Sequence, residues 1–343
     1  MKIIIIGNNT EGNIDGIGKH ARILSEEFNR QGHIVKLYSG TSGLNMFSSL
    51  FSFAMSWVYV KVIFEVLIYH YDLVIVEYPF RDHNPFIAIP HILLSLIAKS
   101  RNTVLAISMH EYDRVSKLRR MLIDVLRSFS DIVYVSEKKY VERFDNGRNK
   151  YYVRTIPNHI VCNRTNKKYK KSTFCYFGLI SKAKAFEEMI EAWRVFNKKN
   201  DCRLHIISSS VIPETIAIPE GIEYHHDLPM EEVVEIMFDC AYSIVPVVPE
   251  IGLNNSSFVS SCQCGCVPIG VFSKDLSSFD YIIHCRDYSI DCFSEALKRT
   301  QEINEDKYKA MSEKCIEYGR NFSLEKTVIQ MLLGYETYVN KHK

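Results

Sequence analysis

A polar loop that leads into a short helix is the part of this sequence best suited to bind an anion. The apolar residues 244–248 predict a buried strand, and the polar residues 250–256 then lead to a helix that Gly265 would end. Asn255 or Ser256 is a suitable N-cap for that helix. The first turn of a helix leaves backbone N–H groups without partners inside the helix. This turn is therefore suited to a phosphate or a diphosphate.

An acidic side chain, Glu250, comes directly before this loop. A carboxylate repels a bare phosphate but accepts hydrogen bonds from hydroxyl groups. Together the loop and the carboxylate indicate a ligand that carries both kinds of group, a phosphorylated polyol such as a nucleotide-sugar. The same residues are equally consistent with an ordinary strand, turn and helix of an α/β sheet, so both interpretations stay open at this point.

A histidine marks a second candidate position. Residues 103–108 predict another buried strand, and His110 comes shortly after it in the sequence Met109-His110-Glu111. Binding groups of α/β proteins lie at the carboxyl ends of parallel strands, which makes His110 a candidate. A lone histidine is also a common structural residue.

Short apolar segments alternate with amphipathic ones along the chain, which predicts an α/β protein with parallel sheets. Near the amino terminus, the loop 7–18 separates the first strand from a helix at 19–31. Gly16 and Gly18 in this loop, together with Ala21, match the pattern GxGxxA. The dinucleotide fingerprint needs its first glycine directly after the strand, and nine residues intervene here. We therefore expect a loop that lets the backbone approach a ligand, and not a dinucleotide site.

The second half repeats the α/β pattern from Thr173 onward, after a polar and basic segment, 161–172, that is typical of a linker. A serine triplet, 208–210, follows one of its strands, and residues 324–340 predict a closing helix. Two α/β domains with loops at their strand ends indicate a ligand cleft between them.

Composition and charge narrow the class of protein. Of the 343 residues, 47% are hydrophobic and 24% are charged, as in globular proteins. Residues 114–154 carry eleven lysines and arginines against five acidic residues, and the amphipathic helix predicted at 115–129 is basic. This part could face an anionic membrane. We expect no nucleic acid partner, because no long basic run or basic-aromatic RNA motif is present.

The cysteines and the amino terminus indicate a cytoplasmic protein. All ten cysteines lie between Cys162 and Cys315, and the first residues have a core-strand pattern and not that of a signal peptide. The thiols are then expected to be reduced. The spacing of Cys262, Cys264 and Cys266 matches no usual zinc pattern, so we expect no metal site there.

One segment raises the question of a membrane span. Residues 37–60 contain no charged side chain, but serine and asparagine recur in them at helical spacing. We expect a buried or membrane-skimming helix and not a spanning one.

Eight motifs, taken in order, resemble those of retaining glycosyltransferases of the GT-B fold, the group found in bacterial polysaccharide and lipid-linked sugar assembly. They cover nearly the whole chain. The motifs are GIGKHARILSEEFNRQGHIVKLYS at 16–39, MHE at 109–111, DIVYVSE at 131–137, IPNHI at 156–160, YFGLISKAKAFEEMIEAW at 176–193, VPVVPEIGL at 245–253, CGCVPIG at 264–270 and NFSLEK at 321–326.

The resemblance implies a fold and a domain division. It implies two Rossmann-like, doubly wound parallel-sheet domains that face each other across a cleft. Residues 1–160 would form the acceptor-side domain and 173–320 the nucleotide-sugar-binding domain, with 161–172 as the linker. The closing helix, 321–343, would pack back on the first domain.

The resemblance also implies roles for individual residues. Gly16 and Gly18 would line the edge of the sugar-phosphate, and His110 would approach the sugar. Lys184 would meet the diphosphate, and Glu250 would hold a sugar hydroxyl. His110, Lys184 and Glu250 are thus the expected catalytic residues.

The chain departs from the family pattern at two points. Leu179 stands where the family usually has arginine after the glycine at 178, and Lys182 is the nearby cation that could compensate. The family's second glutamate falls at Phe258, or at Ser260 when the alignment starts from the glycine at 265. These departures concern nucleotide recognition most directly.

Three further residues fit a different way of binding the nucleotide. Asn254, Asn255 and Ser256 resemble the Asn- and Ser-rich phosphate loop of some branches of the family. With Lys182 and Ser260 they complete the set expected to bind the nucleotide-sugar.

The expected activity is that of a hexosyltransferase (EC 2.4). It would transfer a sugar from a UDP- or GDP-linked donor to a hydroxyl acceptor, lipid-linked or a growing polysaccharide, with retention and without a metal or other cofactor. We expect a cytoplasmic protein at the inner face of the membrane. The alternatives are another GT-B enzyme, such as a nucleotide-sugar epimerase or an inverting transferase, and a catalytically silent subunit that binds a partner or a membrane.

Overall fold

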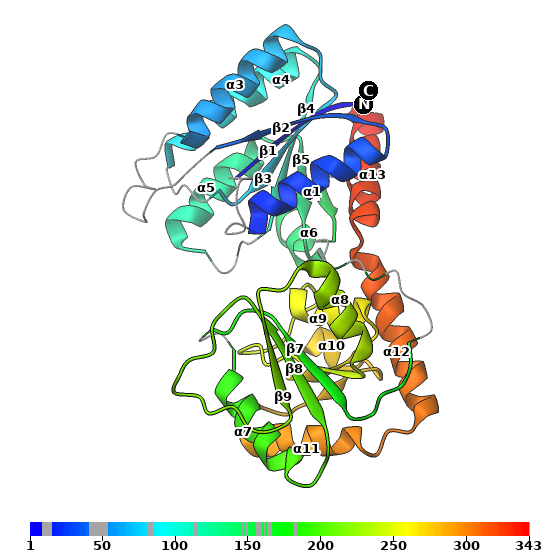
Figure 1. Cartoon of the computed structure of the whole chain (residues 1–343). Helices are drawn as coiled ribbons and strands as arrows, with labels where there is room; N and C mark the ends of the chain where they lie inside the picture. Colours follow the sequence, from blue (N-terminus) through cyan, green and yellow to red (C-terminus); the bar gives the residue numbers. More distant parts are fainter. Residues whose placement is uncertain are drawn as a thin grey trace. The chain divides into compact units, whose positions relative to one another are not determined.

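The computed structural model describes residues 1–8, 16–40, 54–80, 85–110, 112, 115–145, 147, 150–155, 160, 162, 167–181 and 184–342. The chain forms two compact units (Figure 1). Unit 1 consists of Met1–Ile156 and Leu324–Lys343, and unit 2 of Pro157–Ser323. From the sequence, the corresponding boundaries were expected at residues 160 and 320. Each unit is described by itself below.

Unit 1 is built on a parallel sheet with the strand order β2-β1-β3-β4-β5-β6 among the described residues. Its strands are β1 (Lys2–Gly7), β2 (Ile34–Ser39), β3 (Leu73–Tyr78), β4 (Val104–Met109), β5 (Ile132–Val135) and β6 (Tyr151–Val153). Its helices are α1 (Gly16–Arg30), α3 (Ala54–Ile68), α4 (Ala88–Ser100), α5 (Lys117–Ser128), α6 (Lys138–Phe144) and α13 (Leu324–His342), with a 3-10 turn, η1, at Pro85–Ile87.

Helices cover both faces of this sheet, which explains its continuous apolar strands. Neighbouring residues of a strand point to opposite faces. In β1, Ile4 and Ile6 pack in the core formed with α3, α4, α5 and α6, whereas Ile3 and Ile5 pack against α1 and α13. A central strand such as β3 is therefore buried at every position.

Unit 2 repeats this plan with the strand order β12-β11-β10-β7-β8-β9 among the described residues. Its strands are β7 (Thr173–Phe177), β8 (Arg203–Ser208), β9 (Ile222–His226), β10 (Tyr242–Ile244), β11 (Val267–Gly270) and β12 (Ile283–His284). Its helices are α7 (Phe186–Asn197), α8 (Met230–Asp239), α9 (Ser256–Gln263), α10 (Lys274–Ser277), α11 (Ile290–Thr300) and α12 (Glu305–Gly319), and a 3-10 turn, η2, follows at Arg320–Phe322. The predicted fold class, two α/β parallel-sheet domains, is confirmed.

The last helix, α13, belongs to unit 1 although unit 2 separates it from the rest of that unit in the sequence. The Tyr134 hydroxyl donates a hydrogen bond of 2.6 Å to the Met331 carbonyl, and the Thr155 amide donates one of 2.7 Å to the Gln330 side chain. The chain thus starts and ends in the same unit.

Two expected element boundaries are wrong. Helix α1 begins at Gly16 and not after Gly18, so both glycines lie in its first turn. Strand β10 ends at Ile244, although the apolar run continues to Val248. Pro246 lacks the N–H group that would continue the ladder, as does the proline at 249, whose peptide bond with Val248 is cis.

The charge-free segment that raised the question of a membrane span is divided in the structure. Its first residues belong to β2 and its last to α3, and residues 41–53 lie outside the described part of the chain. No helix among the described residues is both long and apolar enough to cross a membrane.

Candidate functional site

Unit 2 contains a pocket of about 400 Å³ at the carboxyl ends of β7 and β8. This edge is where parallel α/β sheets bind ligands. The pocket lies among the end of β7 and the loop after it, Lys184, the end of β8 and the start of α9. Its lining residues are Phe177, Gly178, Leu179, Ser181, Lys184, Ile207, Ser208, Ser209, Ser256 and Ser257.

Gly178 allows these parts to approach one another. Its φ of +144° is one that L side chains rarely adopt. A Cβ at this position would lie 3.0 Å from the Ser257 hydroxyl oxygen and 3.8 Å from the Lys184 Nζ. The loop after β7, the start of α9 and the ammonium group therefore meet at one point.

The ammonium group of Lys184 is half-buried in this pocket. Its backbone is fixed by a hydrogen bond from its N–H to the Ser181 carbonyl and by a bridge to Val247. Burial lowers the pKa of Lys184. Among the described residues, its Nζ has no hydrogen-bond or ion-pair partner. A partly desolvated cation without a counter-ion favours an anionic ligand.

Helix α9 begins at the pocket as the sequence predicted. Asn255 is its N-cap, and the Asn255 side chain accepts a hydrogen bond of 3.1 Å from the Phe258 amide. Gly265 follows the helix with a φ of +66°, as expected for a residue just beyond a helix end. The hydroxyl of Ser261 donates a 2.7 Å bond to the Ser257 carbonyl and lies 2.7 Å from the hydroxyl of Ser243 in β10, from which it accepts; the second contact holds the helix on the sheet. The first turn thus presents its N–H groups beside the Lys184 ammonium.

The remaining residues expected in unit 2 lie in different surroundings. Glu250 is exposed and does not line the pocket, and Asn254 is half-buried beside the cap. Ser260 is completely buried within α9, so its hydroxyl does not face the pocket either. Lys182 lies outside the described residues. The structure therefore brings together Lys184 and Ser256 among the expected residues and adds Ser208 and Ser209 from the serine triplet.

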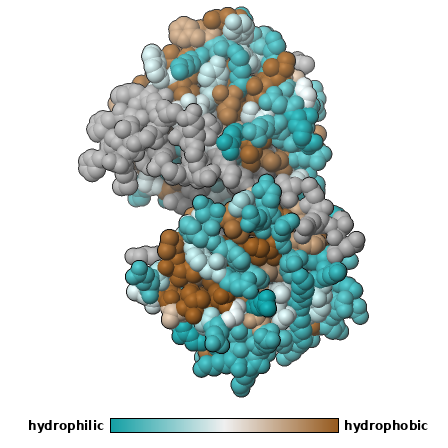
Figure 2. All heavy atoms as spheres, in the orientation of Figure 1, coloured by the Kyte–Doolittle hydropathy of each residue, from teal (hydrophilic) through white to brown (hydrophobic). Residues whose placement is uncertain are grey.

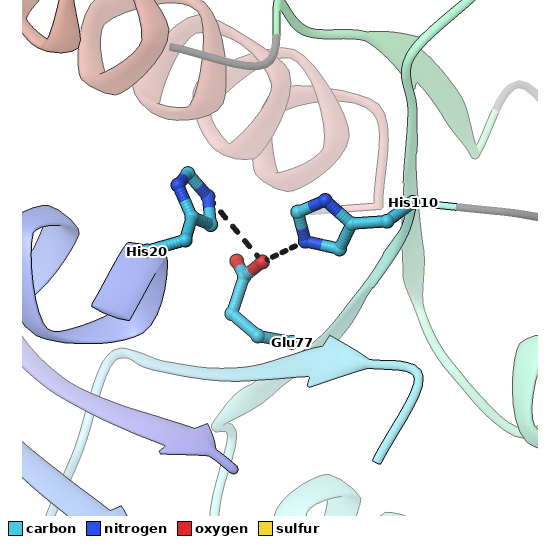
Figure 3. Close-up of side chains that lie close together, drawn as sticks. All are labelled: His20, Glu77 and His110. Atoms are coloured by element: carbon cyan, nitrogen blue, oxygen red, sulfur yellow. Dashed lines mark hydrogen bonds and ion pairs between the residues drawn. The ribbon is translucent and has the colours of Figure 1, made fainter. Parts of the chain in front are cut away.

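Unit 1 contains a buried polar group around Glu77 (Figure 3). We refer to His20, Glu77, His110 and Arg154 as the Glu77 cluster. The Glu77 Oε2 lies 2.6 Å from the His110 Nε2 and 2.8 Å from an Arg154 Nη2. The second terminal nitrogen of Arg154, Nη1, lies 3.0 Å from the His20 Nε2. His20 comes from α1, Glu77 from β3 and His110 from the end of β4, and Figure 3 shows both imidazole rings directed at the carboxylate.

Strand pairing places His110 beside Glu77. The amide of His110 donates to the Tyr78 carbonyl and so extends the pairing of β3 with β4 by one residue. In the same ladder Ser108 is the direct partner of Glu77, and its hydroxyl donates a 2.8 Å bond to the Glu77 Oε1. Both carboxylate oxygens are thus satisfied.

Charges in the cluster favour an ionised glutamate. Complete burial by itself would raise the pKa of Glu77, but the Arg154 guanidinium and the hydrogen bond from His110 outweigh it. The pKa of Glu77 therefore lies well below its ordinary value. Because an ionised carboxylate only accepts, the His110 Nε2 carries a hydrogen and donates it. In a neutral His110 the Nδ1 is then an acceptor.

The sequence analysis missed three members of this cluster, namely His20, Glu77 and Arg154. Glu77 gave a usable signal, because it is an ionisable residue inside the apolar strand Leu73–Tyr78 and such residues need a partner. The identity of that partner could not be predicted, since Arg154 lies 77 residues further along the chain.

Comparison with known proteins supports the fold assignment. No protein-family model and no curated protein matches the sequence. Solved structures do match. A glycosyltransferase from Rickettsia africae has a TM-score of 0.70 at 12% identity, over 98% of each chain. HepE of Anabaena, solved in complex with UDP, has a TM-score of 0.65 at 10% identity, over 97% of this chain and 99% of its own.

A third structure is an alpha-glucosyltransferase in complex with UDP-glucose and DNA that contains an abasic site. It has a TM-score of 0.65 at 13% identity, over 99% of each chain. At these identities the likeness concerns the fold. The chain therefore has the two-domain fold of these enzymes, GT-B.

Proposed function

We propose that this chain is a glycosyltransferase that transfers a sugar from a nucleotide-sugar to a hydroxyl group. One observation carries the proposal. In a GT-B fold, the Lys184 ammonium, which has no partner in the described part of the chain, shares one pocket with the first turn of α9 at the carboxyl ends of β7 and β8. The complexes of structural neighbours with UDP and UDP-glucose support a nucleotide-sugar as the donor.

The pocket matches the electrostatic demand of the reaction. When the bond between the sugar and the diphosphate breaks, negative charge builds up on the departing diphosphate. An ammonium group and helix N–H groups that are already in position can stabilise this charge. Neither requires a metal ion, so we propose a metal-independent transfer. We also propose retention at the anomeric carbon and a UDP- or GDP-linked donor.

His110 is our proposed contact for the sugar. Its Nε2 donates a hydrogen bond to Glu77, and its Nδ1 has no hydrogen-bond partner among the described residues. Glu77 would then orient the ring and determine which nitrogen faces the ligand. For Glu250, which is exposed, we keep the proposal of a contact with a sugar hydroxyl.

Replacing Lys184 tests the proposed function. We expect Lys184→Ala to fold normally and to lose about 100-fold in turnover, because one preorganised donor to a transition-state charge contributes about 3 kcal/mol. A panel of UDP- and GDP-sugars in calorimetry would first identify the donor, and product anomer analysis would test retention. Lys199→Ala is the matched control, because Lys199 is exposed just after the far end of α7. Near-normal turnover of Lys184→Ala would contradict the proposal.

A silent subunit is the second candidate, and Leu179 favours it. Leu179 lines the pocket with 59% of its surface exposed, where the family usually has an arginine that binds phosphate. The same calorimetry separates the two candidates. Binding of none of the nucleotide-sugars would favour the silent subunit.

We further propose that the acceptor is lipid-linked or a growing polysaccharide and that unit 1 contacts an anionic membrane. Helices α3 and α4 pack together and expose many apolar side chains. Figure 2 shows hydrophobic atoms at the top of unit 1, where Figure 1 places these helices. The most exposed of these side chains are Trp57, Phe64, Ile68, Ile89 and Leu96.

The charges on these two helices also suit an anionic surface. Lys61 and Lys99 are exposed, whereas the one acidic residue, Glu65, is paired with Lys36. The basic helix α5 contributes less than the sequence suggested, because its arginines bond to protein groups. Arg119 bonds to the Phe80 carbonyl, Arg120 to the Val115 carbonyl, and Arg127 to Asp124 and Tyr151. Apolar insertion would therefore dominate the contact.

Vesicle sedimentation tests the membrane contact. We expect binding to phosphatidylglycerol vesicles at low salt, weakened in Trp57→Ser and Ile68→Ser because each removes an exposed apolar side chain. Phosphatidylcholine vesicles, which carry no net charge, measure the apolar part of the binding, and the difference between the two lipids measures the part due to charge. No sedimentation of the unmodified protein with either lipid would contradict the proposal.

A further inference from the structure

A second group of histidines and a glutamate lies on the edge of the unit 2 sheet, apart from the pocket. We refer to His205, Glu223 and His225 as the Glu223 cluster. Strand β9 is one of the two edge strands of this sheet as described, and it pairs in parallel with β8 so that His205 lies directly opposite Glu223. His225 is two residues further along β9, so all three side chains project from the same face of the sheet. None of them lines the pocket.

The distances among these side chains resemble those around a bound metal ion. The His205 Nδ1 lies 3.1 Å from the His225 Nε2 and 3.5 Å from the Glu223 Oε2. The ligand atoms of all three residues lie within 4.8 Å of one another. Tetrahedral zinc with bonds of 2.0–2.1 Å separates neighbouring ligand atoms by about 3.3 Å. Small side-chain rotations would therefore complete three ligands of such a site.

The chemistry of the three side chains agrees with the geometry. Two neutral imidazole nitrogens that face each other at 3.1 Å can form only one hydrogen bond, and then only if one of them carries the hydrogen. A cation between them would use both lone pairs, and the carboxylate would supply negative charge. Imidazole and carboxylate together suit zinc and related divalent metals.

The neighbouring charges leave the position accessible. Arg203 approaches the other carboxylate oxygen, Glu223 Oε1, at 3.6 Å, and 71% of its side chain is exposed. It can therefore turn into solvent without breaking a buried contact. Asp239, at the end of α8, adds negative charge in the vicinity of His205. Among the described residues, no other charged group forms an ion pair with the three side chains.

We propose that His205, Glu223 and His225 bind one divalent metal ion of the zinc class and leave its fourth coordination position open. The ion would connect the edge strand β9 to β8 by side-chain bonds, in addition to the backbone ladder. It would thereby stabilise β9, which has only one neighbouring strand among the described residues. This site is independent of the proposed transfer reaction.

Metal titration of protein without a histidine tag tests the site. Protein stripped with a chelator is titrated with Zn²⁺ against a chromophoric competitor, and with Co²⁺, whose visible absorption reports tetrahedral geometry. We expect one equivalent to bind and the melting temperature to rise with Zn²⁺. The Co²⁺ spectrum should lack thiolate bands, which separates this site from the ten cysteines.

Variants separate the site from general surface binding. His225→Ala should bind Zn²⁺ at least about 100-fold more weakly, since loss of a ligand costs at least as much as loss of an outer partner. His226→Ala is the matched control, because His226 is the next residue of β9, is exposed, and points to the opposite face. No Zn²⁺ bound by the unmodified protein, or equal weakening in the two variants, would overturn the proposal.

Discussion

The Glu77 cluster of unit 1 and the Glu223 cluster of unit 2 each place two histidines and one glutamate with their ligand atoms within 4.8 Å. They differ in a fourth member. In the Glu77 cluster the Arg154 guanidinium lies 2.8 Å from the carboxylate and 3.0 Å from the His20 ring, where a metal ion would otherwise bind. In the Glu223 cluster the nearest cation, Arg203, stays at 3.6 Å and is exposed.

The difference shows that residue types alone do not define a metal site. A permanent internal cation neutralises the glutamate of unit 1, and complete burial makes that neutralisation necessary. The result is a rigid group that can orient His110. In unit 2 the Glu223 carboxylate is partly exposed to solvent, so its charge costs little free energy. An exchangeable ion can therefore bind between the imidazoles.

Removal of the Glu77 charge should produce the largest change. Glu77→Gln leaves the buried Arg154 without its counter-ion, which we expect to reduce the free energy of unfolding by about 3–5 kcal/mol. Urea denaturation of the variant measures this loss. If the same substitution at Glu77 cost less than about 1 kcal/mol, the described ion pair would not be the source of stability.

Two further variants test whether the loss of stability comes from the uncompensated charge and whether it is specific to the Glu77 cluster. Adding Arg154→Met to Glu77→Gln should restore part of the stability, because it removes the uncompensated charge. Glu223→Gln, in metal-free protein, is the matched control from the other cluster. Its carboxylate is exposed, so its effect should stay within about 0.5 kcal/mol.

Features that depend on residues close together in the sequence could be predicted, whereas those that depend on residues far apart in the sequence could not. The buried strands, an N-cap at Asn255 or Ser256 and the helix end at Gly265 follow from a few neighbouring residues; the structure confirms them and makes Asn255 the cap. The early start of α1 and the early end of β10 were missed, because glycine tolerates either conformation and proline interrupts a ladder that apolar residues otherwise favour.

The sites depend on longer-range order. Lys184 and Ser256 were predicted to act on one ligand through a family resemblance, and the topology β10-β7-β8 brings them into one pocket. The pairing of Glu77 with Arg154, and that of His205 with Glu223, requires the strand register, which a single sequence does not state. Ionisable residues inside buried strands are the one local signal that such partners exist.

Acid should affect the buried groups of unit 1 in two successive pH ranges. Burial lowers the pKa of His91 from 6.5 to about 4, although the hydrogen bond between its ring and the Leu126 carbonyl acts in the opposite direction. The unfolded chain then takes up a proton at His91 before the folded chain does. The His91 contribution to stability is full above pH 6.5 and falls as the pH drops toward about 4.

Glu77 acts in a lower range with the same sign. Its pKa in the folded protein is held below the ordinary 4.5, so its contribution is full above that pH and falls only below it. The difference in unfolding free energy between the unmodified protein and Glu77→Gln should therefore stay constant from pH 7 to about 5 and shrink below about 4.5, whereas the difference to His91→Gln should already shrink below 6.5. Urea titrations across this range measure both differences. A Glu77 difference that grew as the pH fell from 7 to 5 would mean that the folded protein takes up a proton on this carboxylate before the unfolded chain does, and therefore that Arg154 does not hold it ionised.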